Sequence, residues 1–321
     1  MNKRRRRIKL HIDSLAAGGD GVGRDEEGRV TFVPRAAPGD SLLVELIEDK
    51  KQFARGRVVE VLEASPSRQE PKCKLFIAGQ CGGCQWQHVS AEAQTLAKEE
   101  IVDNGLRRAI GRGLSRSDLL QPCESYGWRR RARLSFWAGG GKKLIGFYPP
   151  KSKQISDVPR CPQLEDKLQA ALTLVRKHLL PALRHRGEIE ILLGEDGRSQ
   201  VAVHGTVAPK GLQALAAEAS ISGVINGKNR LGEAQVELEG GVLTSADGFA
   251  QASKAGNIAL GEVVAGALGD LSGKSVLELF AGTGNFTRLL KAAKRVVAVE
   301  LASGRPALAA EHIEWRQADV G

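Results

Sequence analysis

The chain has 321 residues, of which 42% are hydrophobic and 26% are charged, and its formal net charge is +10 at pH 7. This length can supply two or three domains with cores of their own, and the composition is typical of a globular protein. No apolar run is long enough for a membrane span, and no signal-peptide hydrophobic region follows the basic N-terminal residues. We therefore expect a cytoplasmic protein that is not associated with a membrane.

The excess of positive charge lies in the middle of the chain. Residues 65–244 carry 26 basic and 18 acidic side chains, whereas residues 1–64 carry 13 and 11, and residues 245–321 carry 8 of each. A basic middle predicts a polyanionic partner, most simply a nucleic acid. A surface whose charge serves only solubility is the alternative.

The first 64 residues are predicted to form a small β-barrel. A basic run over residues 3–7 is expected to be an arm that reaches phosphates. Short apolar runs separated by turn residues then predict strands at residues 8–15, 30–33, 41–47 and 56–62. Strands at this spacing favour a closed barrel of the OB type, and a barrel without a ligand is the alternative. The Ser- and Pro-containing residues 64–71 are typical of a linker.

All five cysteines lie in one part of the chain, at Cys73, Cys81, Cys84, Cys123 and Cys161. An odd number argues against a disulfide framework and for metal ligation or free thiols. The two glycines between Cys81 and Cys84 let both thiolates turn toward one metal centre, for which Cys73 supplies a third ligand and Cys161 is the best fourth. Four thiolates suit zinc or a [4Fe–4S] cluster, and the spacing leaves both open. Cys123 is interpreted as a free buried thiol.

Patterns in the middle of the chain predict helices over residues 91–108 and 164–183, and a hairpin formed by residues 189–193 and 200–203. Between them, Arg129-Arg-Arg-Ala-Arg133 stands beside Trp128, Phe136 and Trp137. Guanidinium groups next to aromatic rings can grip RNA phosphates and stack on bases. An ordinary strand with one charged face explains the same pattern.

A strand, a small-residue turn, a helix and a second strand are predicted in order from residue 275. The apolar run over 275–279 suits a buried parallel strand, and the turn Ala281-Gly-Thr-Gly284 lets a ligand approach the backbone. A helix is predicted from Asn285 to about Lys294. The next strand ends at Glu300, where nucleotide-binding folds place the acceptor for ribose hydroxyls. The pattern therefore predicts an adenosine-type ligand.

The glycine spacing narrows the choice of that ligand. The third glycine of the dinucleotide fingerprint is missing, and no Gly-Lys-Ser/Thr follows. The pattern Glu278-x-Phe-x-Gly-x-Gly284 instead resembles the first motif of S-adenosylmethionine (SAM) methyltransferases, whose ligand carries no phosphate. An α/β crossover without a ligand is the alternative.

Longer stretches of the sequence resemble one family, the TRAM-domain RNA uracil-C5 methyltransferases, in the ribosomal-RNA branch that holds a [4Fe–4S] cluster. The matching residues are Ile12–Arg24 and Val30–Asp40 of the TRAM domain, Cys73 with Cys81–His88, Trp128–Leu134, Gly146–Tyr148, Ser156–Cys161, Phe249–Gln251 and Leu279–Phe286. The resemblance implies a multidomain fold of α+β and α/β type. It places an OB-like TRAM barrel that binds RNA at 1–64, and a central α+β domain for the cluster and RNA at 65–244. It places a partial Rossmann-like SAM methyltransferase domain at 245–321, on which the helix 91–108 is a candidate to pack.

The resemblance also implies site residues. Cluster ligands would be Cys73, Cys81, Cys84 and Cys161, and the SAM site would contain Gln251, Phe280, Gly282, Gly284, Asn285, Glu300 and Asp319. Two positions depart from the family pattern. Seven residues separate Cys73 from Cys81 where five are usual, an insertion that costs little loop-closure entropy. Ser253 stands where an asparagine is usual.

In the family, a cysteine thiolate adds to uracil C6, the activated base takes the methyl group from SAM, and a general base removes the C5 proton. The nucleophile and the base lie beyond the third and fourth strands of the SAM domain. No cysteine follows Cys161 here. We therefore expect a C-terminally truncated domain without a catalytic cysteine, an exposed apolar edge at residues 276–280, and a chain that binds SAM weakly and does not methylate alone.

The expected partner is RNA, ribosomal rather than transfer RNA, and the expected state is a monomer. Two alternatives remain open at this point. One is a non-catalytic RNA-binding protein built from the barrel and the basic middle, and the other is a zinc-bound variant of the same fold.

Overall fold

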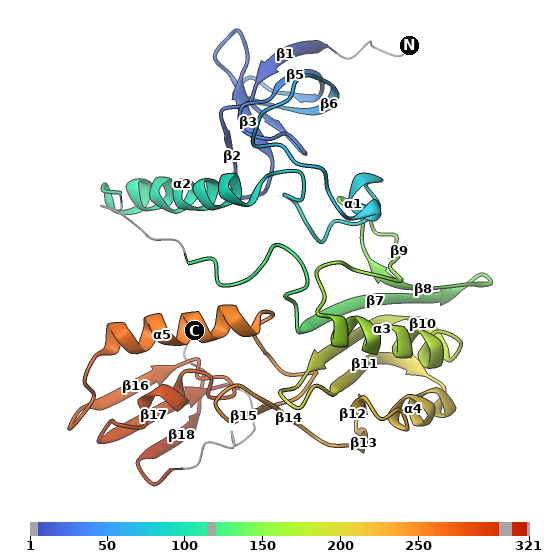
Figure 1. Cartoon of the computed structure of the whole chain (residues 1–321), viewed down its shortest axis with the longest axis vertical. Coiled ribbons are helices and arrows are strands. Elements are labelled where there is room, and N and C mark those ends of the chain that lie inside the picture. The colour runs from blue at the N-terminus through green and yellow to red at the C-terminus, as the bar shows by residue number, and fades with distance from the viewer. Residues whose placement is uncertain (1–5, 114–119, 302–309, 320–321) are drawn as a thin grey trace. The chain divides into compact units, whose positions relative to one another are not determined.

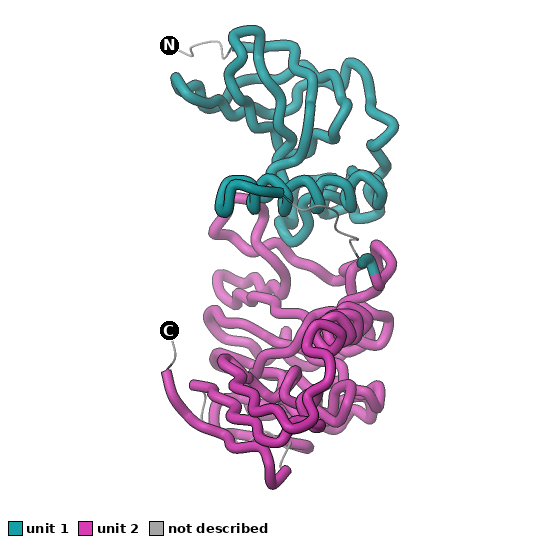
Figure 2. Tube along the Cα trace, turned by 90° about the vertical axis from the view of Figure 1, so that its left-hand side faces the viewer, with its two compact units in different colours: residues 1–121 teal, residues 122–321 magenta. Residues whose placement is uncertain are grey.

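The computed structural model describes residues 6–113, 120–301 and 310–319. The chain forms two compact units, residues 1–121 and 122–321 (Figure 2). The boundaries expected at residues 64/65 and 244/245 stay predictions. No helix among the described residues is long and apolar enough to cross a membrane.

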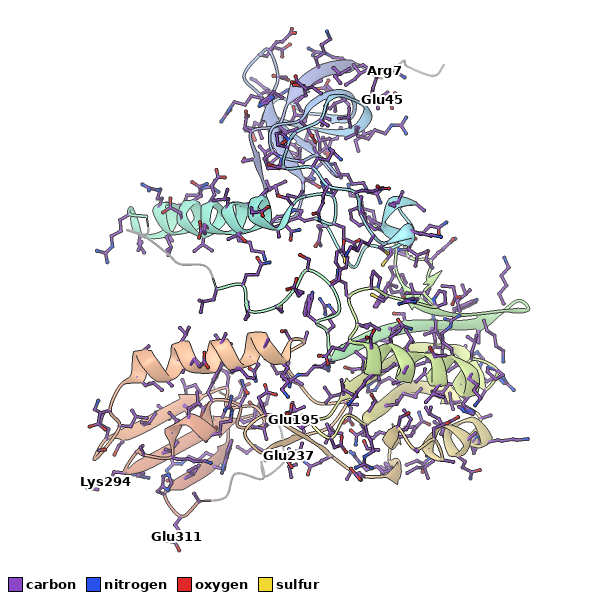
Figure 3. The ribbon with its side chains drawn as sticks, viewed as in Figure 1. Arg7, Glu45, Glu195, Glu237, Lys294 and Glu311 are labelled. Carbon is purple, nitrogen blue, oxygen red and sulfur yellow. The ribbon has the colours of Figure 1, made fainter. Side chains whose placement is uncertain are left out.

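The first unit is built on a six-stranded sheet in the order β1-β5-β6-β4-β3-β2 (Figure 1). Its strands are β1 (Arg7–His11), β2 (Ser14–Leu15), β3 (Gly21–Arg24), β4 (Val30–Val33), β5 (Ser41–Asp49) and β6 (Phe53–Glu63). Neighbours are antiparallel except β4 and β6, and Arg7 of β1 lies opposite Glu45 of β5, with 3.8 Å between Nε and Oε1 (Figure 3). The core of this sheet consists of Leu10, Ile12, Val33, Ala36, Leu42, Val44, Leu46 and Ala54.

Residues 8–15, predicted as one strand, are divided between β1 and β2. The reason is a change of backbone partner: the Ile12 N–H donates to the Asp40 carbonyl, and the Asp13 N–H donates to the Val22 carbonyl. The chain thus leaves β5 and joins β3 within two residues.

The segment read as a linker is fixed to this sheet by a buried carboxylate. Asp40 is fully buried and accepts hydrogen bonds from the backbone N–H groups of Ala37 and Ser65 and from the guanidinium of Arg68. Burial alone would raise the pKa of Asp40, but the bonds from Arg68 and the two N–H groups lower it. Residues 65–68 are therefore held in place by a long-range ion pair that no local pattern indicates.

Two helices complete the first unit, α1 (Lys74–Ile77) and α2 (Ala91–Ile110). Ser90 caps the start of the long helix with a side chain that accepts from the Ala93 N–H, and Gly111, whose φ of 74° suits a glycine, caps its end. Its buried residues, Ala93 and Ala97, pack with Leu15, Ala37 and Val89 of the same unit. The helix predicted over 91–108 is thus present, two residues longer.

The second unit contains a seven-stranded sheet in the order β13-β12-β11-β10-β7-β8-β9. The strands are β7 (Arg131–Gly139), β8 (Lys142–Phe147), β9 (Ser156–Asp157), β10 (Leu183–Leu193), β11 (Ser199–Val207), β12 (Ile221–Asn226) and β13 (Asn229–Gly232). Helices α3 (Asp166–Leu179) and α4 (Pro209–Ala216) contribute to the same hydrophobic core. The predicted hairpin is confirmed, since β10 pairs antiparallel with β11 and Leu193 lies opposite Ser199.

The C-terminal part of this unit contains the short pair β14 (Val236–Leu238) and β15 (Val242–Thr244), and helix α5 (Lys254–Leu268). Figure 1 shows α5 beside a parallel sheet of β16 (Ser275–Leu279), β17 (Arg295–Glu300) and β18 (Ile313–Gln317). Within the described residues β16 pairs with β17 alone, and Leu277 is 63% exposed. The expected exposed edge is confirmed.

The helix predicted from Asn285 to about Lys294 is not formed. The segment contains one short 3₁₀ turn, η1 (Thr287–Leu290), followed by turns that lead into β17. Tertiary contacts hold both ends of η1. Thr287 donates a hydrogen bond to Glu278 of β16, and Leu290 is buried against Leu271 and Val296.

Candidate functional site

The glycine turn, defined as residues 280–285, follows β16 and adopts a left-handed backbone at three positions. Phe280 and Gly282 have φ of 57° and Gly284 has φ of 91°. A left-handed phenylalanine costs about 1 kcal/mol or more, and such strain is found at ligand sites. The ring of Phe280 is exposed, and a Cβ placed on Gly282 would meet no atom within 4 Å. The turn therefore presents open space beside its backbone.

Acidic side chains of β16 and β17 hold the glycine turn and the segment that follows it. Oε2 of Glu300, at the end of β17, accepts a hydrogen bond of 2.8 Å from the Gly282 N–H. Glu278 of β16 accepts a bond of 2.7 Å from Thr287 Oγ1, and burial raises the pKa of Glu278. Asp319 follows β18, whose Gln317 pairs with Glu300, so both acids stand at the carboxyl ends of adjacent strands. Ligands of open α/β sheets bind at that edge.

Asn285 ends the turn and belongs to a buried polar network. Its amide forms two reciprocal hydrogen bonds of 2.8 Å with the amide of Asn257 in α5. Asn257 Nδ2 also donates to Glu239, which accepts from both Nη atoms of Arg130. Burial would raise the pKa of Glu239, but the hydrogen bonds from Arg130 and Asn257 lower it.

Arg130 also fixes the segment that contains Gln251. Its Nε donates to the Gln251 carbonyl at 3.0 Å, and its backbone N–H donates to the Ala252 carbonyl at 2.9 Å. Ser253 then begins α5, and its side chain accepts from the Gly256 N–H at 2.9 Å. Asparagine and serine both serve as N-caps, which gives the substitution at 253 a simple physical reason. Sequence reasoning missed Glu239 and Asn257 because both lie outside the recognised motif.

The structure thus places the predicted residues Phe280, Gly282, Gly284 and Asn285 in one turn and Glu300 in hydrogen-bond contact with it, and it places Asp319 after the neighbouring strand. It ties the Gln251 backbone to the same network through Arg130.

The arginine-rich segment before and within β7 is largely paired with carboxylates. Arg130 bonds to Glu239, Arg131 to Glu190 and Arg133 to Glu188. The guanidinium of Arg129 lies 4.6 Å from the centre of the Trp128 ring. Three of these arginines therefore support the fold, and a phosphate-gripping role for the run stays a prediction.

Three of the predicted cluster ligands lie in one loop of the first unit, the cysteine loop (residues 73–84). Cys73 precedes α1, and the Gly83 N–H points at Cys81 Sγ at 3.5 Å. Burial raises the pKa of the Cys81 thiol, and the charges of Cys84 and Cys73 add to that effect.

The fourth predicted ligand, Cys161, belongs to the second unit, where its backbone N–H donates to Gln169 Oε1 at 2.9 Å. None of the five cysteines, among them the half-buried Cys123, forms a disulfide with another described cysteine. Among the described residues no group of three or more His, Cys, Asp or Glu side chains is arranged for a metal ion.

Arg35, which follows β4, and His88, which precedes α2, support the cysteine loop. The Phe76 ring stacks on His88 with 5.9 Å between centroids, and the Arg35 guanidinium lies 4.9 Å from the centre of the Phe76 ring. Arg35 also donates to the carbonyls of Phe76 and Ile77. His88 is buried, which lowers its pKa, and its Nε2 lies 3.2 Å from the Ala36 carbonyl. These contacts give His88 a structural role.

A pocket of about 410 Å³ in the second unit was not anticipated from the sequence. It lies between the start of α3 and the β10–β11 turn, and its charged lining consists of Arg130, Glu165, Asp166, Lys167, Glu195 and Lys254. Lys254 and Glu195 form an ion pair of 2.6 Å, and burial raises the pKa of Glu165. Both signs of charge are present, which favours no single class of ligand.

Comparison with known proteins agrees with this architecture. Residues 2–59 match the TRAM domain family. The fold is similar to the crystal structure of Pyrococcus abyssi tRNA (uracil-54, C5)-methyltransferase in complex with S-adenosyl-L-homocysteine (SAH). The TM-score is 0.65 at 19% sequence identity, covering 92% of this chain and 73% of that one. The protein therefore has a mixed α/β methyltransferase fold with an N-terminal TRAM domain.

Sequence similarity identifies the family more closely. The chain is 34% identical over 317 residues to the 23S rRNA (uracil(1939)-C(5))-methyltransferase RlmD of Klebsiella pneumoniae, covering 94% of this chain and 70% of the relative. It is 35% identical over 316 residues to RlmD of Cronobacter sakazakii, covering 91% and 69%. With RlmD of Photorhabdus laumondii it shares 34% identity over 209 residues, which cover 47% of that relative. The chain belongs to the RlmD family.

Proposed function

We propose that this chain serves in the SAM-dependent methylation of uracil C5 in RNA, with ribosomal RNA as the substrate. The observation that carries the proposal is 34% identity along 94% of the chain to a protein named for that reaction. The open, left-handed glycine turn with Glu300 at its edge supports an adenosine-containing ligand. We also propose a cytoplasmic location, which suits a ribosomal-RNA substrate, and a monomeric state.

The donor would occupy the open side of the glycine turn. Glu300 would accept hydrogen bonds from ribose hydroxyls with the carboxylate that also holds the Gly282 N–H. The exposed ring of Phe280 offers a face to the adenine, and Gly282 and Gly284 let the ligand approach the backbone. Gln251, Asn285 and Asp319 complete the proposed site. When bound, SAM supplies an electrophilic methyl group.

We further propose that Cys73, Cys81, Cys84 and Cys161 hold a [4Fe–4S] cluster. The support is the donor set itself, since thiolates are the ligands of such clusters and three of these thiols share one loop. Zinc takes the same ligands. Anaerobically purified protein should absorb visible light and contain iron, and colourless protein that contains zinc would contradict the cluster.

The N-terminal sheet is proposed to act as an OB-type TRAM barrel that binds RNA. The sequence contains no cysteine after Cys161, so residues 1–321 offer no thiol in the donor-binding part of the chain. We propose that these residues bind the donor and RNA without transferring the methyl group by themselves.

Calorimetric titration with SAH and filter binding of ribosomal RNA fragments test these proposals on the 321-residue chain. We expect saturable SAH binding, RNA affinity that falls steeply with salt, and no labelled methyl group on uridine. RNA binding without SAH uptake would favour a non-catalytic RNA-binding protein. Labelled methyl-uridine formed by this chain alone would contradict the assignment of binding without transfer.

A further inference from the structure

We propose that Glu239 is a positioning residue for the methyl donor, because it fixes, through Asn257, which way the side-chain amide of Asn285 faces in the glycine turn. The inference rests on the proposed donor site and extends it to two residues outside the glycine motif. Glu239 and Asn257 are 9% and 3% exposed, so no ligand needs to touch them.

The first step is that Glu239 can only accept hydrogen bonds. Its two carboxylate oxygens face the guanidinium of Arg130, which is 2% exposed and does not lose its proton in proteins. Paired with this buried cation, Glu239 stays ionised. Every group that faces its oxygens must therefore present a donor.

The second step is that this acceptor decides the orientation of Asn257. The Nδ2 atom of Asn257 donates to Glu239 Oε1 and also to Asn285 Oδ1. A flipped amide would instead set the carbonyl oxygen of Asn257 against the carboxylate, and two acceptors repel each other. The orientation of an amide is set by the network around it, and here the network begins at an ion.

The third step carries the orientation to the donor site. Asn257 Oδ1 accepts from Asn285 Nδ2 at 2.8 Å, and Asn257 Nδ2 donates to Asn285 Oδ1 at 2.8 Å. If Asn285 alone were flipped, both pairs would become donor against donor and acceptor against acceptor. Asn285 thus keeps one N–H and one lone pair for a ligand, and their positions cannot be exchanged.

The decisive variant is Glu239→Gln, which keeps the shape of the side chain but adds a donor where only acceptors stood. Asn257 and Asn285 can then take either orientation, and we expect the affinity for SAH to fall by about tenfold, the usual effect of one misdirected hydrogen bond. The matched control is Glu237→Gln, two residues away, whose side chain is exposed (Figure 3). The control should bind SAH like the unaltered chain.

A double-mutant cycle separates positioning from a general loss of structure. If Glu239 acts through Asn285, Glu239→Gln should cause little further loss of SAH affinity in an Asn285→Ala background. Should Glu239→Gln fail to fold, Asn257→Ala interrupts the same relay and is measured in the same cycle with Asn285→Ala.

The possible results lead to different conclusions. Unchanged SAH affinity in Glu239→Gln, or losses that simply add in the double variant, would overturn the positioning role while leaving the donor site intact. If the unaltered chain bound no SAH, this result would contradict the proposed donor site and therefore also the positioning role of Glu239.

Discussion

The glycine turn and the cysteine loop are both proposed to hold a cofactor, but they are held in place in different ways. Polar side chains fix the glycine turn, with Glu300 on Gly282 and Asn257 on Asn285. In the described cysteine loop, Cys81 is the one thiol that takes part in a hydrogen bond, and the loop is supported through Phe76.

This difference indicates how each site is prepared for its ligand. The polar network orients the contacting atoms of the glycine turn before any donor binds, which lowers the ordering cost of binding. The cysteine loop is fixed at the ring and carbonyls of α1, and beyond the contact of the Gly83 N–H with Cys81 the proposed cluster would set the orientation of its sulfur atoms. A substitution that removes the contacts holding the glycine turn should therefore leave the cysteine loop unchanged, and the reverse should also be true.

The largest effect is expected from Arg68→Met, which removes the cation that faces the fully buried Asp40. Breaking a buried ion pair from one side should lower the free energy of unfolding by about 3 kcal/mol, since the backbone N–H groups of Ala37 and Ser65 still stabilise the charge. Urea denaturation measures this change. The control Arg57→Met removes a 65% exposed arginine and should cost less than about 1 kcal/mol. Equal losses in both variants would contradict the proposed role of Asp40.

Arg35→Ala removes the contacts that join the N-terminal sheet to α1. Without the bonds to the Phe76 and Ile77 carbonyls, amide hydrogen exchange at residues 77–80 should become about tenfold faster. SAH affinity should stay unchanged, because the glycine turn has its own support. Faster exchange together with weaker SAH binding would show that the two sites are not independent.

Mild acid should also distinguish the two sites. Burial lowers the pKa of His88 below its ordinary 6.5, so below that pH the unfolded chain binds a proton that the folded chain does not. Stability of the first unit should therefore fall as the pH drops from 7 to 5.5, by at most about 1.4 kcal/mol per pH unit.

The glycine turn should resist the same acid. The pKa of Glu239 is lowered from 4.5, so its contribution is present above that value and is lost only at lower pH. Hydrogen exchange at pH 7 and 5.5 measures both regions, and His88→Gln should remove the pH dependence of the first. Loss of protection in the glycine turn at pH 5.5 would contradict this assignment.

The smallest loss of stability is expected at the start of α5. Ser253→Ala removes the cap that accepts from the Gly256 N–H and should cost about 1 kcal/mol, whereas Ser253→Asn should be nearly neutral. Thermal unfolding of the two variants measures the difference. Equal midpoints would show that the cap contributes nothing here.

The sequence by itself determined the elements whose signal is local. The turn of glycines between two apolar runs, the acid at Glu300, helix α3 and the β10–β11 hairpin all follow from residues that are neighbours in the chain. Resemblance added the proposed donor-site residues, of which Phe280, Gly282, Gly284 and Asn285 lie in the glycine turn and Glu300 contacts it, and the cysteines, three of which lie within residues 73–84.

Only the tertiary structure decided how those elements are held. Arg130 meets Glu239 across 109 residues, and Arg35 reaches the Phe76 carbonyl across 41. The backbone conformation of the segment after Asn285 is determined by its contacts with Glu278 and Leu271, although the sequence pattern of this segment predicts a helix. Local patterns report on periodicity and turn chemistry, whereas the partner of a buried charge is chosen by packing. The network that orients Asn285 therefore has no counterpart in any short stretch of the sequence.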